Sequence, residues 1–338
     1  MEIRTCKECG FILGTRPNSK DVNGVCLACL NKERKNTINW KERQTWLTEY
    51  LQEHKNPDGQ WDVLVGVSGG KDSCAIVSRL IEEHKVPHDR MLLVRVMDEF
   101  TPSKAGLYNL DNLVKHYDLD LMNFRCAPQT FVRETKKSFV EEMNPLKWIE
   151  QQHYEKPLEV AKAFSIPTVF MGENSAFEYG ESEECEIFHS ASTDATKVIF
   201  FGAIWPYSTN DSLEQAKRIG FKTLSDFDDW QRQGAGDDFS QIDSYGYMIH
   251  LWTKFIKFGF QRVTDMASRF VREGSLTKAQ AERMIKDSDW ICDPLAKKDF
   301  CRAIGITEEE FRETIDRFAN RDLLVKDING NWRRKDLI

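Results

Sequence analysis

The stretch Val63-Leu64-Val65-Gly66-Val67-Ser68-Gly69-Gly70-Lys71-Asp72-Ser73 decides the fold class of this 338-residue chain. A short apolar run ends in a glycine-rich turn, and the amphipathic stretch Cys74–Glu83 follows it. This order predicts a buried strand, a loop at the C-terminal edge of a parallel sheet, and a helix. Glycines let the main chain approach an anion closely, and a helix N-terminus carries partial positive charge. The stretch therefore predicts a phosphate-binding loop.

The loop is not of the Walker A type. Only three residues separate Gly66 from Gly70, and Asp72 follows the lysine where a Walker A loop has serine or threonine. The segment instead resembles the PP-loop of the ATP pyrophosphatases, which implies that ATP binds here and is cleaved to AMP and pyrophosphate. The residues expected to bind ATP are Ser68, Gly69, Gly70, Lys71, Asp72 and Ser73.

Strands and helices alternate after the loop. Strands are expected at Met91–Met97, Leu119–Phe124 and Pro167–Met171, and helices at Lys104–His116, Gln129–Glu142 and Pro157–Phe164, with a further helix at Asn39–His54 before the loop. Such alternation predicts an α/β fold with a doubly wound parallel sheet. Ligands of these sheets bind beyond the carboxyl ends of the strands, so residues after Val67, Met97 and Met171 should meet in one crevice.

Polar residues stand at these strand ends. Asp98 follows the second strand and is expected near the nucleoside of ATP, and Gly172, Glu173 and Asn174 follow the last of the three. ATP needs a divalent cation with oxygen ligands, so Asp72 and Glu173 are the predicted ligands of Mg²⁺. Together with Lys71 they are the predicted catalytic residues. A solvated carboxylate at a helix N-terminus is the alternative for Glu173.

Two CxxC pairs open the chain, Cys6 with Cys9 and Cys26 with Cys29, separated by sixteen residues rich in Gly, Asn and Pro. This spacing predicts a zinc ribbon whose four thiolates bind structural Zn²⁺. Four unligated thiols and an iron–sulfur cluster are the alternatives. The expected organisation is a ribbon at 1–35, a PP-loop domain at 36–210, and a helical region with an acidic insertion at 211–338.

The C-terminal region is predicted to be mostly helical, with helices at Ser244–Phe258, Val263–Glu273, Thr277–Asp287 and Thr307–Ala319. Spacings of seven and three place Arg262, Arg269 and Arg272 on one helical face, where they could meet an anionic sugar substrate. A solvated basic face is the alternative. Lys257 is a candidate catalytic residue that supports the pyrophosphate or the developing charge.

Composition narrows the class of protein. The net charge of −7 disfavours a protein that mainly coats nucleic acid. No stretch is apolar enough to span a bilayer, and the N-terminus lacks the apolar region of a signal peptide, so a cytoplasmic location and no membrane partner are expected. The nine cysteines should then be reduced or metal-bound.

The chain resembles the N-acetyl sugar amidotransferase family, PP-loop enzymes of surface-polysaccharide biosynthesis. The resemblance rests on the CxxC pairs, Val67–Ser73, Gly172–Gly180 and Lys254–Ala281. It implies conversion of an acetamido sugar, which could be nucleotide-linked, into an acetamidino sugar, with ATP adenylating the acetamido oxygen and ammonia displacing AMP. Within the matching runs, the candidate substrate-binding residues are Glu178, Tyr179, Arg262, Arg269 and Arg272.

The resemblance also implies a partner, a glutaminase subunit related to that of histidine biosynthesis. The chain agrees, because it has neither a Gly-x-Cys-x-Gly nucleophile elbow nor a cysteine at position 2. The main alternative is a tRNA-thiolating enzyme, since some of these also join a zinc ribbon to a PP-loop. That chemistry needs relay cysteines, and the remaining Cys74, Cys126, Cys185, Cys292 and Cys301 form no further CxxC. A scaffold with a relic ATP site is the third alternative.

Overall fold

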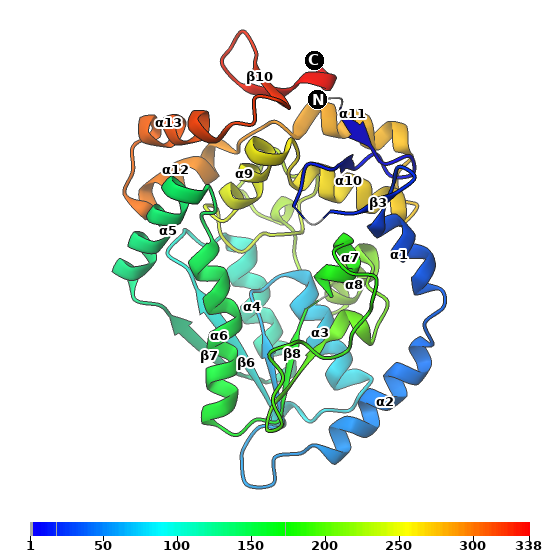
Figure 1. Ribbon diagram of the computed structural model, residues 1–338. Coiled ribbons are helices and arrows are strands. Elements are labelled where there is room, and N and C mark those ends of the chain that lie inside the picture. The colour runs from blue at the N-terminus through cyan, green and yellow to red at the C-terminus, as the bar shows by residue number, and fades with distance from the viewer. Residues whose placement is uncertain (1–2, 18, 173) are drawn as a thin grey trace.

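The protein is built around a parallel β-sheet, which the computed structural model describes for residues 3–17, 19–172 and 174–338 (Figure 1). The sheet has five strands in the order β7-β6-β5-β8-β9, and every neighbouring pair is parallel. The strands are β5 (Val63–Gly66), β6 (Met91–Met97), β7 (Asp120–Arg125), β8 (Thr168–Met171) and β9 (Lys197–Phe200). The predicted α/β fold with a parallel sheet is therefore confirmed.

Alternating apolar residues let each strand contribute to two cores. On β5, Val63 and Val65 pack in the larger core, whereas Leu64 points into a smaller one on the opposite face. Helix α6 (Lys147–Ala163) covers the smaller core through Val160 and Ala161. The larger core takes in α2 (Trp40–Glu53), α3 (Lys71–Glu82), α4 (Lys104–Tyr117) and α5 (Pro128–Glu142). Both faces of the sheet are thus covered, as a parallel sheet requires.

The N-terminal region, the predicted ribbon, is a small unit of two hairpins beside the sheet domain. Two short antiparallel hairpins, β1 (Arg4–Thr5) with β2 (Ile12–Leu13) and β3 (Asp21–Val22) with β4 (Val25–Cys26), lead into α1 (Leu27–Lys35). Helix α1 packs on the short helix α7 (Ser175–Tyr179), which follows β8. The ribbon is therefore held against the carboxyl edge of the sheet.

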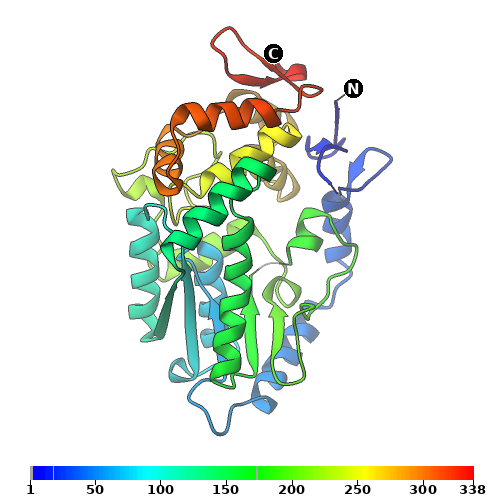
Figure 2. The ribbon, with the colours of Figure 1, turned by 60° about the vertical axis from the view of Figure 1, so that its left-hand side comes forward.

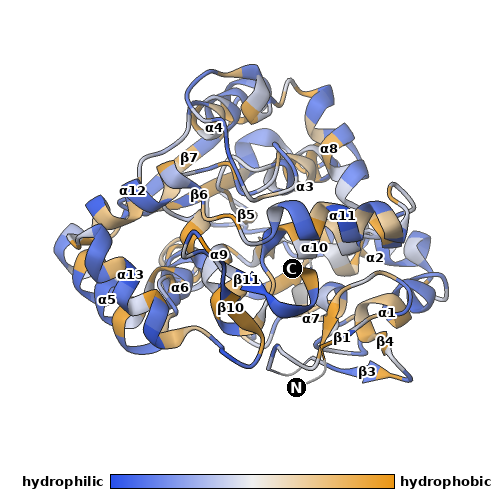
Figure 3. Ribbon diagram, turned by 90° about the horizontal axis from the view of Figure 1, so that it is seen from above, coloured by the Kyte–Doolittle hydropathy of each residue, from blue (hydrophilic) through white to orange (hydrophobic). Residues whose placement is uncertain are grey.

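The C-terminal helices lie over the carboxyl ends of the strands (Figures 1 and 2). They are α9 (Met248–Phe258), α10 (Arg262–Arg272), α11 (Lys278–Ser288), α12 (Pro294–Ile304) and α13 (Glu308–Phe318), followed by the hairpin β10 (Leu324–Lys326) and β11 (Trp332–Arg334). Seen from above, outer helices such as α13 show hydrophilic residues on one side and hydrophobic residues on the other (Figure 3). Their apolar sides close the larger core.

Backbone hydrogen bonds join this C-terminal region to the sheet domain. Ser103 N donates to Asp243 O at 3.0 Å, and Tyr245 N donates to Thr101 O at 2.9 Å. Gly106, in the first turn of α4, lies so close that a Cβ atom there would stand 2.9 Å from Asp243 Cα. The segment after the acidic stretch thus runs directly beside the start of α4.

Three differences from the predicted elements have physical causes. The helix expected to begin at Pro157 begins at Lys147 and continues through the proline, because its buried residues on both sides of Pro157 pack against the sheet. The short edge strand β9 was not predicted, since its four residues carry little periodicity. Helix α12 was also missed, although Asp293 caps it through Ala296 N and Pro294 begins it.

The acidic stretch is folded into the molecule. Helix α8 (Thr209–Arg218) packs on α3, and the short 3-10 turn Leu224–Asp226 buries Leu224. Arg232 and Asp237 form an ion pair whose side chains are 2% and 1% exposed. The predicted acidic insertion therefore contains a helix and buried side chains of its own.

Gly69→Ala should destabilise the protein. Gly69 has φ +92°, and a Cβ atom there would stand 2.6 Å from the carbonyl oxygen of Gly106. The strain and the clash together should lower the free energy of unfolding by about 1 to 3 kcal/mol, measured by urea denaturation. Gly66→Ala is the control, because no described atom lies within 4 Å of its Cβ position. Equal stability of the two variants would contradict the tight packing of the loop on α4.

Candidate active site

The PP-loop turns from β5 into α3, and within it Gly70 N donates to the hydroxyl of Ser68 at 3.4 Å. Gly70 is the N-cap of α3 and makes no side-chain cap hydrogen bond. The hydroxyl of Ser73 donates to Gly70 O at 2.9 Å, which fixes the turn. Gly66 and Gly172, at the ends of the neighbouring strands β5 and β8, have no described atom within 4 Å of their Cβ positions. The ends of β5 and β8 thus leave room for a ligand near the first turn of this twelve-residue helix, and a helix N-terminus favours an anion such as phosphate.

Lys71 and Asp72 form an ion pair at this helix start. Lys71 Nζ lies 2.7 Å from Asp72 Oδ1, and the two side chains are 2% and 35% exposed. Burial alone would raise the pKa of Asp72, but Lys71, with smaller effects of Arg269 and Arg262, holds it below its usual range. Asp72 is therefore an ionised carboxylate with a free face, as a ligand of Mg²⁺ must be.

A tyrosine joins the loop to the C-terminal region. Tyr207, just before α8, has its hydroxyl 3.2 Å from Lys71 Nζ and 2.7 Å from Arg269 Nη1. The Arg269 guanidinium also lies over the rings of Tyr207 and Tyr179, at 4.8 Å and 5.0 Å from their centroids. Helix α10 thereby brings a second positive charge, 5% exposed, next to the loop lysine.

The other predicted strand-end residues have different surroundings. Asp98 accepts hydrogen bonds from Phe100 N and from the hydroxyl of Ser244, both at 3.0 Å, and burial raises its pKa to about 6. Asn174 caps α7, accepting from Phe177 N and donating to Glu186 O, both at 3.2 Å. Asn174 therefore stabilises the start of α7, next to the site where it was predicted to bind ATP. Glu173 lies outside the described residues, and its assignment as a Mg²⁺ ligand stays a prediction.

Two residues of the site were missed by sequence reasoning. Asp243 lies near Asp72 and Asp98 and beside Ser68, and burial raises its pKa to about 7 although Arg95 and Ser68 favour its ionised form. Tyr207 is the other missed residue. Neither belongs to a local motif, because only the packing of the C-terminal region on the sheet brings them to the loop.

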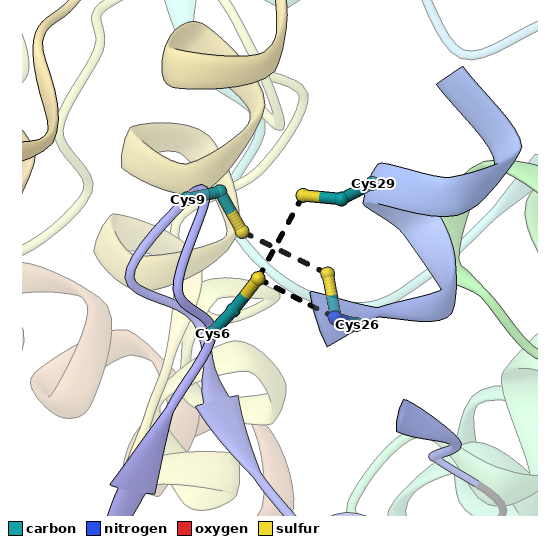
Figure 4. A group of neighbouring side chains, drawn as sticks. All are labelled: Cys6, Cys9, Cys26 and Cys29. Atoms are coloured by element: carbon teal, nitrogen blue, oxygen red, sulfur yellow. Dashed lines mark hydrogen bonds between the residues drawn. The ribbon is translucent and has the colours of Figure 1, made fainter. Parts of the chain in front are cut away.

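The four cysteines of the ribbon converge on one point (Figure 4). Their sulfur atoms all lie within 4.8 Å of one another, with Cys6 and Cys29 at 3.8 Å and Cys9 and Cys26 at 3.7 Å. A tetrahedral ion with Zn–S bonds of about 2.3 Å separates its sulfurs by about 3.8 Å. The geometry therefore fits one zinc ion better than a cluster, which divides its cysteines among several irons.

Arg272 faces this cysteine cluster. Its Nη1 lies 3.7 Å from Cys9 Sγ. Hydrogen bonds from Cys26 and Cys29 lower the pKa of Cys9 to about 7, and the charge of Arg272 acts in the same direction. Since four thiolates around a divalent ion carry excess negative charge, the half-buried Arg272 guanidinium would stabilise the ligated state. Arg272 thus faces the cysteine cluster, and its role in substrate binding stays a prediction.

The remaining candidate residues are spread around the same end of the sheet. Arg262 is 6% exposed and donates from Nε to the hydroxyl of Ser240 at 3.3 Å, so the alternative of a solvated basic face does not hold for it. Glu178 pairs with Lys35 at 2.7 Å. Lys257 has Lys254, Glu142 and Glu150 as its charged neighbours, which places it on the side of α5 and α6 and apart from the Lys71–Asp72 pair. Its catalytic role stays a prediction.

These features define an α/β protein with a parallel sheet covered on both faces, a glycine-rich loop between β5 and α3, an N-terminal cysteine cluster and a helical C-terminal part. Residues 225–335 match the C-terminal domain of WbpG-like LPS biosynthesis proteins. This part of the chain is therefore similar to a domain of LPS biosynthesis proteins, in agreement with the family resemblance of the sequence. That domain contains Arg262, Arg269 and Arg272, the arginines of α10.

Comparison with whole chains gives distant similarities. An uncharacterized protein of Methanocaldococcus jannaschii is 22% identical over 284 residues, which make up 82% of this chain and 93% of that protein. The NH₃-dependent NAD synthetase from Campylobacter jejuni aligns with 54% of this chain and 74% of its own, at 17% identity and a TM-score of 0.34. NMN synthetase from Francisella tularensis aligns with 81% and 96%, at 11% identity and a TM-score of 0.38. Within the described ranges, no helix has the length and apolarity needed to cross a membrane.

Cys9→Ser should release the metal of the ribbon. The variant loses one of four ligands, so zinc measured by mass spectrometry of the purified protein should fall from about one ion per chain to nearly none. Limited proteolysis should then cut within residues 1–35 first, because the short hairpins have no other large core. Cys185→Ser, outside the cluster, is the control and should keep its zinc. Iron in place of zinc would contradict the assignment.

Proposed function

We propose that the protein is an ATP-dependent amidating enzyme of LPS biosynthesis. In its specific form, the reaction adenylates the acetamido oxygen of an N-acetylated sugar and replaces it with ammonia, giving an acetamidino sugar, AMP and pyrophosphate. One observation carries the proposal: Tyr207 links the PP-loop lysine to Arg269 of the WbpG-like domain. The nucleotide loop and the domain related to LPS biosynthesis therefore line the same site.

The described residues suit an adenylating step. The first turn of α3 and Lys71 bind the pyrophosphate part of ATP, and the buried ammonium offsets charge that develops as pyrophosphate leaves. Asp72 would hold Mg²⁺, which supplies electrostatic stabilisation of the phosphates when bound. An amide carbonyl is a poor electrophile, but its O-adenylate is a good one, so ammonia attacks the carbon and AMP departs. The protein mainly positions the reactants.

The proposal includes a glutaminase partner as the natural source of ammonia. Its support is the sequence, which has no nucleophile elbow and no cysteine at position 2 for hydrolysis of glutamine. The isolated chain is therefore expected to use ammonium salts and not glutamine.

The surroundings of the other cysteines disfavour the tRNA-thiolation alternative. A sulfur relay needs thiolates, which form where positive charge lowers the thiol pKa. Burial instead raises the pKa of both Cys126 and Cys185. It also raises the pKa of Cys74 to about 12 and that of Cys301 to about 11. These four thiols are therefore poor sources of thiolate.

A sugar panel tests the function directly. The chain is incubated with ATP, Mg²⁺, ammonium chloride and a set of N-acetylated sugars, free and nucleotide-linked, and products are scored by mass for exchange of oxygen for NH. At least one sugar should give this exchange together with AMP and pyrophosphate, and glutamine in place of ammonium should give none. Release of ADP, or exchange driven by glutamine with the isolated chain, would contradict the proposal.

Asp72→Asn should reduce AMP formation on the order of 100-fold or more, because the neutral amide no longer holds the metal beside the phosphates. The amide oxygen still accepts from Lys71, so the unfolding midpoint should change little. Asp111→Asn is the matched control, since Asp111 is an exposed carboxylate paired with Lys115 on α4. Comparable AMP formation by Asp72→Asn and wild type would remove Asp72 from the mechanism.

Cys126→Ser and Cys185→Ser separate amidation from thiolation. Both variants should keep most of the ammonium-dependent AMP formation, because neither thiol takes part in amidation. A thiolating enzyme that used either one would lose its activity. Thermal unfolding of each variant is measured in parallel, since Cys126 is only 5% exposed and the buried hydroxyl costs some stability.

A further inference from the structure

The segment that follows β8 lies beside the PP-loop where it begins and against the ribbon where it continues. Gly172, the first residue after β8, lines a small cavity together with Asp72 and Tyr207. Helix α7 comes next and packs on α1 of the ribbon. A helix of five residues has too few hydrogen bonds to be stable by itself. The position of this segment therefore depends on the ribbon against which it packs.

Asn31 on α1 joins the two segments through buried hydrogen bonds. Asn31 is 1% exposed, and its Nδ2 donates to the carbonyl oxygens of Phe177 at 2.6 Å and of Ser182 at 2.9 Å. Its Oδ1 accepts from Arg34 Nη1 at 2.7 Å, which fixes the orientation of the amide. The last carbonyl groups of a helix have no partner within the helix. One asparagine thus satisfies main-chain acceptors in α7 and just beyond it.

Close backbone packing and ion pairs add to this contact. Gly180 ends α7 with φ +82°, and a Cβ atom there would stand 2.7 Å from Ala28 N. Three ion pairs also join the two segments, Arg16 with Glu181, Arg34 with Glu183, and Lys35 with Glu178. The pairs of Glu181 and Glu183 are open to solvent, where ion pairs contribute little to stability. The buried amide of Asn31 is therefore the stronger link.

The cysteine cluster holds α1 in turn. Cys26 is the N-cap residue of α1, and Cys29 lies in its first turn. The other two cysteines of the cluster come from the first hairpin, between β1 and β2. A metal ion bound by all four would therefore fix the start of α1 to that hairpin.

We propose that Asn31 is a positioning residue, which couples the metal state of the ribbon to the order of residues 174–184 and, through them, to the nucleotide site beside Asp72. This inference rests on the proposed function only in taking ATP as the ligand of the PP-loop. Coupling between two sites is reciprocal. If the bound metal orders the segment that begins at the nucleotide site, bound ATP must favour the metal-bound ribbon by the same factor.

Hydrogen exchange tests the link without nucleotide or turnover. Asn31→Ala and the nearly isosteric Asn31→Asp both remove the two donated hydrogen bonds, so the amides of residues 174–184 should exchange about tenfold faster in each zinc-loaded variant. Exchange in β5 and β8 should stay unchanged. Removal of zinc from the wild type with a chelator should speed exchange in the same residues.

Asn36→Ala is the matched control for these variants. Asn36 is an exposed asparagine at the end of the same helix, and its side chain makes no hydrogen bond with the described residues, so its exchange pattern should equal that of the wild type. Unchanged exchange of residues 174–184 in both Asn31 variants would overturn the proposal. So would unchanged exchange there after zinc is removed from the wild type.

Zinc release tests the coupling, which a purely structural role of Asn31 would not produce. Transfer of zinc to a zinc-selective chelating dye is timed with and without ATP and Mg²⁺, and ATP binding is measured separately by equilibrium dialysis. ATP should slow zinc release from the wild type about fivefold and should leave release from Asn31→Asp unchanged. An equal slowing in both proteins, or none in a wild type that binds ATP, would overturn the proposal. If the wild type binds no ATP, the proposed function fails, and hydrogen exchange still decides the role of Asn31.

Discussion

The buried charge of Lys71 is the constraint on which the active end of this molecule depends. An ammonium that is 2% exposed is tolerated only with close partners, and the structure provides Asp72 and the hydroxyl of Tyr207. Because Tyr207 also binds Arg269, the lysine at the start of α3 is tied to a helix of the C-terminal region. The loop, the segment before α8 and helix α10 are therefore positioned by one connected set of charges.

The cysteine cluster is connected to this set of charges through Arg272. Arg272, one turn after Arg269 on α10, lies against Cys9, and Asn31 on α1 donates to the carbonyl oxygens of Phe177 and Ser182 at 2.6 Å and 2.9 Å. The ribbon thus contacts both α7 and α10. The cysteine cluster thus contacts, through Arg272, the helix whose Arg269 lies beside the PP-loop.

Sequence reasoning was most successful where structure is local. Between Val63 and Glu82, the apolar run predicted the strand, the glycines predicted the loop, and the amphipathic stretch predicted the helix. The spacing of the two CxxC pairs predicted that four sulfur atoms come together. It was weaker where tertiary packing decides. The spacing of Arg269 and Arg272 correctly gives a shared face, but only the fold shows that one meets Tyr207 and the other meets Cys9. Asp243 and Tyr207 carried no signal, because nothing in their neighbours marks them.

The contact between Gly106 and Asp243 has a consequence for the chain as a whole. Main-chain atoms of the sheet domain and of the C-terminal region touch there, and Ser103 and Thr101 exchange backbone hydrogen bonds with the same segment. Neither part can be cut out without exposing main-chain groups of the other. The two parts therefore cannot be exchanged independently of each other. A chimaera that joined this nucleotide-binding half to a foreign C-terminal half would have to preserve the backbone contacts between Thr101–Gly106 and Asp243–Tyr245.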